Sequence, residues 1–168
     1  MSDMTISQCL RRVSKLKGEL KELMGRASLG VQYSEDAPPA FAFWESLAQA
    51  DGVRAELVGL ESALRVTNAN TKITFKGQEV TLSEATIILQ ETKGRVAWLN
   101  SLAVKAQAKT TSSHVTYDEM GERVKVQMTT ICMLPEAERA RMVRDEQNSF
   151  DELNDLVENV NHRTVLSK

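Results

Sequence analysis

Residues 5–27 read TISQCLRRVSKLKGELKELMGRA, and this stretch decides the fold class. Its apolar residues recur at alternating spacings of three and four, which is the heptad pattern of a helix packed lengthwise on another helix. Thr5 is a favourable N-cap residue for that helix. The repeating positions are Ile6, Cys9, Val13, Leu16, Leu20, Leu23 and Ala27. The candidate interface for self-association is therefore Ile6, Val13, Leu16, Leu20 and Leu23.

Three further segments show helical periodicity, at residues 40–66, 82–109 and 135–161. The second of them opens with the pattern Thr-Leu-Ser-Glu, in which Thr81 and Glu84 are spaced as a capping box. We therefore expect four long helices in all.

Glycines interrupt the helix predicted over residues 40–66. Gly52 and Gly59 each weaken a helix by up to about 1 kcal/mol relative to alanine. The alternative is that they permit close contact with another helix.

Two segments alternate between apolar and polar residues. Residues 72–81 read KITFKGQEVT and turn at a glycine, which is typical of a short β-hairpin. Alternation returns around Val124, Val126 and Met128, and it predicts a second β segment over residues 115–131. The Ser/Thr-rich residues 110–116 are expected to be a loose connection up to the start of that segment.

Together these elements predict one domain over residues 1–168, mainly all-α. Its architecture is an elongated antiparallel four-helix bundle or coiled coil with short β-hairpins at the tips. Gly and Pro together number only 11, which favours few, long elements. The first helix carries six basic and two acidic residues, and residues 136–161 carry three basic and eight acidic. We expect these two helices to pair, within the chain or between copies.

The composition excludes several functional classes. With a net charge of −2, the chain has no global attraction to nucleic acid or anionic lipid. No apolar run approaches the ~20 residues of a membrane span, and the amphipathic N-terminal stretch predicts no signal peptide. We expect a cytoplasmic protein. Cys9 and Cys132 lack a CxxC neighbourhood, so reduced thiols are favoured over a disulfide.

No motif for catalysis is present, and we expect neither a catalytic residue nor a cofactor nor a metal. His114 and His162 lack partners at the spacing of a metal site or a catalytic triad. There is no phosphate-binding loop, GxSxG or HExxH pattern. The connector between the second and third helices is the best place for a structural or recognition tip. Its candidate residues are Asn68, Asn70, Thr71 and Thr81.

The order of these segments resembles a family of small uncharacterised helical proteins of bacteria and phages, sometimes labelled septicolysin-like. The resemblance covers most of the chain, through TISQCLRRVSKLKGEL, ALRVTNANTKI, TLSEATIILQETKGRVAWLNSLA and FDELNDLVENVNHRTVL. Its most specific part is residues 67–71 followed by Thr81-Leu82. It implies a helical, oligomeric fold in a bacterial cell or a phage-infected host. The label also implies a pore-forming toxin, which no residue pattern here supports.

The resulting hypothesis is a non-enzymatic structural or protein-interaction protein that self-associates or binds another protein. A nucleic-acid-associated role is the alternative. It would use the cluster of cations Arg11, Arg12, Lys15, Lys17 and Lys21. A membrane-active role through the same basic amphipathic helix is the third hypothesis.

Overall fold

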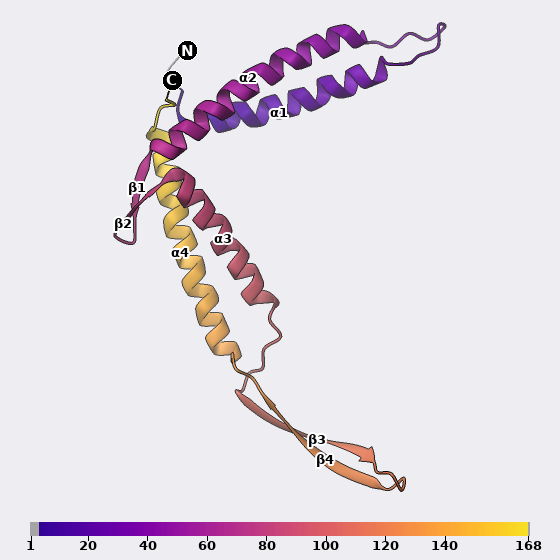
Figure 1. The fold of residues 1–168 in the computed structure, drawn as a ribbon, viewed down its shortest axis with the longest axis vertical. Coiled ribbons are helices and arrows are strands. Elements are labelled where there is room, and N and C mark those ends of the chain that lie inside the picture. Colours follow the sequence, from indigo (N-terminus) through magenta and orange to yellow (C-terminus); the bar gives the residue numbers. More distant parts are fainter. Residues whose placement is uncertain (1–3, 168) are drawn as a thin grey trace. The chain divides into compact units, whose positions relative to one another are not determined.

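The computed structural model describes residues 4–167, which form four helices and two β-hairpins (Figure 1). The helices are α1 (Ile6–Leu29), α2 (Phe43–Asn70), α3 (Leu82–Ser101) and α4 (Glu136–Arg163). The strands are β1 (Lys72–Phe75), β2 (Gln78–Thr81), β3 (Lys109–Tyr117) and β4 (Arg123–Ile131). The prediction of a mainly helical fold with β-hairpins is confirmed. The helices predicted over residues 5–27, 40–66 and 135–161 have observed bounds within four residues of the predicted ones.

Two compact units exist within the domain predicted over residues 1–168. Unit 1 contains the residues up to Ile87 and those from Leu153 onward, and unit 2 is Ile88–Glu152. Unit 1 therefore consists of two separate segments of the chain, with unit 2 inserted between them.

In unit 1, α1 packs along α2 (Figure 1). α1 begins in a capping box, in which the Gln8 N–H donates to Thr5 Oγ1 at 3.3 Å and the Thr5 N–H donates to Gln8 Oε1 at 3.0 Å. The predicted heptad residues form the seam of this pair. Ile6, Cys9, Val13, Leu16, Leu23 and Ala27 are buried, and Leu20 is half-buried.

The predicted hairpin forms from β1 and β2, and its register places Ile73 opposite Val80. Its turn residues Lys76 and Gly77 both have positive φ, as a two-residue type I′ turn requires. Ile73 and Phe75 point to the buried side of the hairpin, and Leu82 is buried directly after it. The hairpin thus closes one end of the unit 1 core.

Backbone contacts join the two segments of unit 1. Thr5 forms an antiparallel bridge with Val165. The Ile6 N–H donates to Thr164 O at 2.9 Å, and the Leu166 N–H donates to Met4 O at 3.0 Å. The segment from Leu153 also contributes buried side chains, because Leu153 and Val157 belong to the core.

In unit 2, the prediction of a helix over residues 82–109 is wrong at its C-terminal end. α3 ends at Ser101, and the chain then runs without regular structure to β3. The Leu102 N–H closes the helix onto Leu99 O at 3.4 Å, and Arg139 from α4 donates to the same carbonyl. A cation at the last carbonyls stabilises a helix end. This cap comes from 40 residues further along the chain, so the local sequence does not reveal it.

The second hairpin, β3–β4, is longer than predicted. Nine residue pairs run in continuous register from Lys109–Ile131 to Tyr117–Arg123. Residues 110–116, expected to be a loose connection, are therefore ladder residues, since threonine and valine suit a strand. The turn is held by Asp118, whose Oδ1 accepts from the Met120 and Glu122 N–H groups at 2.9 Å.

Candidate functional site

The predicted tip residues lie where α2 gives way to β1, and most of them are used in local hydrogen bonds. α2 continues to Asn70, so Asn68 and Asn70 occupy its last turn rather than a loop. Asn70 Nδ2 donates to Val66 O at 3.0 Å, and Thr71 Oγ1 donates to Thr67 O at 2.8 Å. These bonds prolong and close the helix by four residues beyond the predicted end. Asn70 and Thr71 therefore have a structural role in this fold.

Asn68 differs from its neighbours. Its side chain is half-buried, and its Oδ1 is buried without a hydrogen-bond partner among the described residues. A buried acceptor that makes no hydrogen bond destabilises the fold. The Asn68 Oδ1 therefore accepts no backbone N–H among the described residues.

Thr81 and Glu84 form the predicted capping box of α3. The Glu84 N–H donates to Thr81 Oγ1 at 3.1 Å, and the Thr81 N–H donates to Glu84 Oε2 at 2.7 Å. The Thr81 hydroxyl also donates to this carboxylate at 2.9 Å. These hydrogen bonds to Thr81 lower the pKa of Glu84 below the ordinary value of a glutamate, 4.5.

The pKa of Glu84 leads to a testable pH dependence. A carboxylate with a lowered pKa stabilises the fold above about pH 4.5, and this contribution is lost as the pH falls through its folded-state pKa. We expect Glu84→Gln to lower the melting temperature at pH 7, with a difference that shrinks toward pH 3. Thermal unfolding between pH 3 and pH 7 measures it, and Glu91→Gln, an exposed position on the same helix, is the control. A difference that stays constant with pH would contradict this account.

The candidate self-association seam on α1 is occupied within the chain. Ile6, Val13, Leu16 and Leu23 are buried in unit 1, so α2 of the same chain covers them. Cys9 lies on the same seam, and its Sγ is 3.8 Å from Leu60 O. Burial raises the pKa of the Cys9 thiol, which keeps it protonated and unreactive. An interface between copies therefore requires another surface.

Some cations of α1 form ion pairs with glutamates of α2. Among the described residues, no ion pair joins α1 to the acidic helix α4, although the charges of these two helices predicted that they would pack together. Arg12 binds Glu56 through two hydrogen bonds of 2.8 Å, and Lys17 lies 2.8 Å from Glu61, both on α2. These contacts lower the pKa of both glutamates. The ion pairs and the buried apolar residues of α1 therefore both contribute to its packing on α2.

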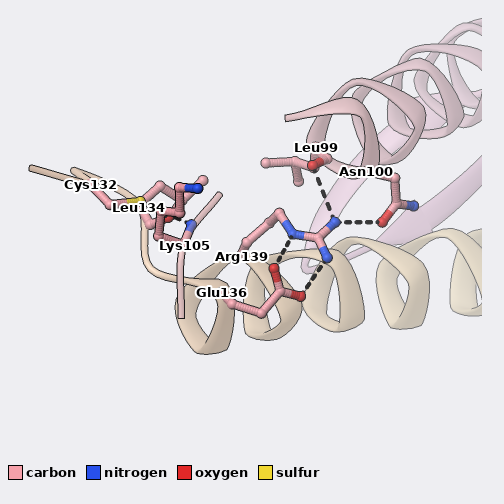
Figure 2. A network of polar contacts seen from close by, with 7 residues as sticks. All are labelled: Leu99, Asn100, Lys105, Cys132, Leu134, Glu136 and Arg139. Carbon is pink, nitrogen blue, oxygen red and sulfur yellow. Dashed lines mark hydrogen bonds and ion pairs between the residues drawn. The ribbon is translucent and has the colours of Figure 1, made fainter. Parts of the chain in front are cut away.

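In unit 2, Arg139 joins α3 to α4 (Figure 2). Its guanidinium forms a fork on Glu136 and also donates to Leu99 O at 3.4 Å and to Asn100 Oδ1 at 3.0 Å. The ion pair lowers the pKa of Glu136. The guanidinium uses its donors in these contacts, so this cluster is a structural connection and not an anion site.

Cys132 lies beside this connection (Figure 2). Its thiol donates to Leu134 O at 3.1 Å, and the Lys105 N–H donates to Cys132 Sγ at 3.4 Å. The Cys132 N–H also donates to Ala108 O at 2.8 Å. Neither Cys9 nor Cys132 forms a disulfide, and Cys9 is buried whereas Cys132 is half-buried.

The β3–β4 hairpin is exposed along its whole length. Because side chains alternate across a strand, the register puts Val124, Val126 and Met128 on one face with His114. That face carries no lysine, arginine or carboxylate. The opposite face carries Lys109, Arg123 and Lys125 with Val115, Tyr117 and Ile131.

A shallow open groove in unit 1 is lined by Lys15, Gly18, Glu19, Glu22, Leu23, Arg26 and Gln49. Its charges are mixed, and Arg26 is paired with Glu22 and stacks on Phe41 at 4.6 Å. Residues 4–167 contain no group of three or more His, Cys, Asp or Glu side chains placed to hold a metal ion. Within the same range, no helix combines the length and the apolar character of a membrane span.

Comparison with protein-family models, curated proteins and solved structures finds no match to this chain. The resemblance to the septicolysin-like family therefore stays a prediction.

Proposed function

We propose that this protein is a non-enzymatic structural or protein-interaction component that associates with copies of itself. The observation that supports it is the solvent-accessible area of 12431 Å². A compact monomer of 18.7 kDa exposes about 8,300 Å². Two separate globules of the sizes of units 1 and 2 would together expose about 9,900 Å². The chain thus exposes about 2,500 Å² more than two separate compact globules of these sizes would.

This excess has the size of an extensive protein–protein interface. Obligate homodimers bury about 2,000–5,000 Å² in total, or about 1,000–2,500 Å² per copy. Much of the exposed surface is apolar, and Trp44, Trp98, Ile87 and Ile131 are each more than half exposed. Large exposed aromatic side chains such as these two tryptophans are enriched at protein–protein interfaces.

The exposed β3–β4 hairpin also supports association. A two-stranded hairpin alone is at best marginally stable in water, and both outer edges of this one have free backbone groups. Its uncharged face, with Val126 at its centre, can be covered without desolvating an ion. In this proposal, the predicted elongated antiparallel four-helix bundle or coiled coil is completed by helices of more than one copy.

A nucleic-acid-associated role remains the alternative. The pairing of Arg12 and Lys17 with glutamates reduces the positive charge that α1 could offer to phosphates. A membrane-active role is third, because the apolar side of α1 is already buried on α2. We propose a cytoplasmic location in a bacterial cell or a phage-infected host, in line with the septicolysin-like resemblance.

Light scattering after size-exclusion chromatography tests the proposal. We expect a mass of at least twice 18.7 kDa at micromolar concentration, and the same mass in 1 M salt, because apolar burial is not screened by ions. A mass of 18.7 kDa under both conditions would contradict self-association.

A further inference from the structure

The helix α2 has two apolar sides, although α1 covers only one of them. The side toward α1 contains the buried residues Ser46, Ala50 and Thr67. On the opposite side, residues at alternating spacings of four and three are all exposed, and they are Ala48, Gly52, Ala55, Gly59, Ser62 and Val66. We call this the outer face of α2. A helix with apolar residues on both sides is normally covered on both sides.

The outer face combines apolar area with room for close approach. Val66 on this face is 51% exposed, and Val58 at its edge is 58% exposed. A Cβ atom added at Gly52 or Gly59 would meet nothing within 4 Å, so these glycines are not required by packing within the chain. Each nevertheless weakens the helix by about 1 kcal/mol relative to alanine. Small residues at these positions let a second helix backbone come close.

Building on the proposed self-association, we propose that the outer face of α2 packs antiparallel against the outer face of α2 in a second copy. The two-fold axis lies near Val58. An isologous contact of this kind is the commonest way in which identical chains pair. The excess exposed area of about 2,500 Å² per chain is more than enough for such a contact.

The charges at the rim of the face select the antiparallel orientation. Asp51, Val58 and Arg65 are spaced seven residues apart, so they lie on one edge of the face, and all three are exposed. In an antiparallel pair, this edge of one copy lies against the same edge of the other copy, because each flanking position of the heptad then contacts the equivalent position of the second helix. Asp51 of one copy then approaches Arg65 of the other, and Val58 meets Val58.

Cysteine crosslinking tests both the face and the orientation, in a Cys132→Ser background where the remaining Cys9 is buried. We expect Val58→Cys to give a covalent dimer on mild oxidation. Ser62→Cys is the matched control on the same face. Near a two-fold axis at Val58, its thiols lie about 12 Å apart along the helix, too far for a disulfide. A dimer from Ser62→Cys but not from Val58→Cys would overturn the antiparallel arrangement.

A second variant fills the space instead. Gly59→Leu should leave the isolated chain folded, since a side chain there meets no atom of the same chain. In the assembly it overpacks the contact, and we expect association to weaken about tenfold or more. Gly25→Leu on α1, where a Cβ also meets nothing within 4 Å, should change neither folding nor association.

Two results distinguish a wrong interface from the absence of self-association. An assembly that persists in Gly59→Leu, with no crosslink through Val58→Cys, would overturn the outer face as the interface and leave self-association standing. A parent protein that is monomeric at micromolar concentration would overturn both.

Discussion

Leu16→Ala is expected to lower the free energy of unfolding by about 2–5 kcal/mol. Leu16 is 1% exposed and lies in the middle of the seam between α1 and α2. Truncation removes buried apolar atoms and leaves a cavity that helices tied by Arg12–Glu56 and Lys17–Glu61 can close only in part. Chemical denaturation monitored by circular dichroism measures the loss.

Leu10→Ala is the matched control, because Leu10 is on the same helix but 44% exposed. We expect it to cost less than about 1 kcal/mol. The dependence on protein concentration separates two explanations. If the seam is filled within the chain, the loss in Leu16→Ala is the same at low and high concentration. A loss that disappears at high concentration would show that the seam is an interface between copies.

Thr67→Val is the second large expected effect, a destabilisation of about 1–2 kcal/mol. Thr67 is 1% exposed, and its Oγ1 accepts the Ser167 N–H at 2.8 Å while donating to Ala63 O at 2.8 Å. Valine keeps the shape of threonine and removes both hydrogen bonds. The two segments of unit 1 therefore lose a connection between residues 100 positions apart.

Hydrogen exchange gives this prediction a local readout. In Thr67→Val, the amide of Ser167 should exchange faster, whereas amides near Leu16 should change only through global stability. Thr86→Val provides the comparison, because Thr86 is exposed and its hydroxyl bonds only Ser83 O, three residues away. Equal protection of Ser167 in both variants would show that Thr67 does not hold this segment.

The parts of the fold that the sequence predicts well are governed by local chemistry. The heptad spacing of α1, the N-cap at Thr5, the capping box at Thr81 and the turn at Gly77 each depend on residues within a few positions of one another. The end of α3 depends on Arg139 from a distant helix, and no local signal marks Ser101 as the last residue. Such an end is set by tertiary contacts, which periodicity does not report.

The candidate site follows the same rule. The residues of the α1 seam are expected from the sequence to meet a second copy. Within the chain they lie against α2, and all of them but the half-buried Leu20 are buried. The glycines of α2 carried the relevant signal. Gly52 and Gly59 fall in register with Ala48, Ala55 and Ser62, a second heptad pattern within one helix. Its significance emerges only when the structure shows which side of α2 is already covered.

The split construction of unit 1 has a consequence for the order of events during synthesis. The backbone of Met4, Thr5 and Ile6 bonds to residues 164–166, and all of unit 2 is translated between the two. At about 5–20 residues per second, α1 and α2 can pair many seconds before their closing segment exists. The outer face of α2 is thus presented to neighbouring nascent chains while unit 1 is still incomplete. Pairing of copies on one messenger RNA would shield that face early and shorten the time during which it can aggregate.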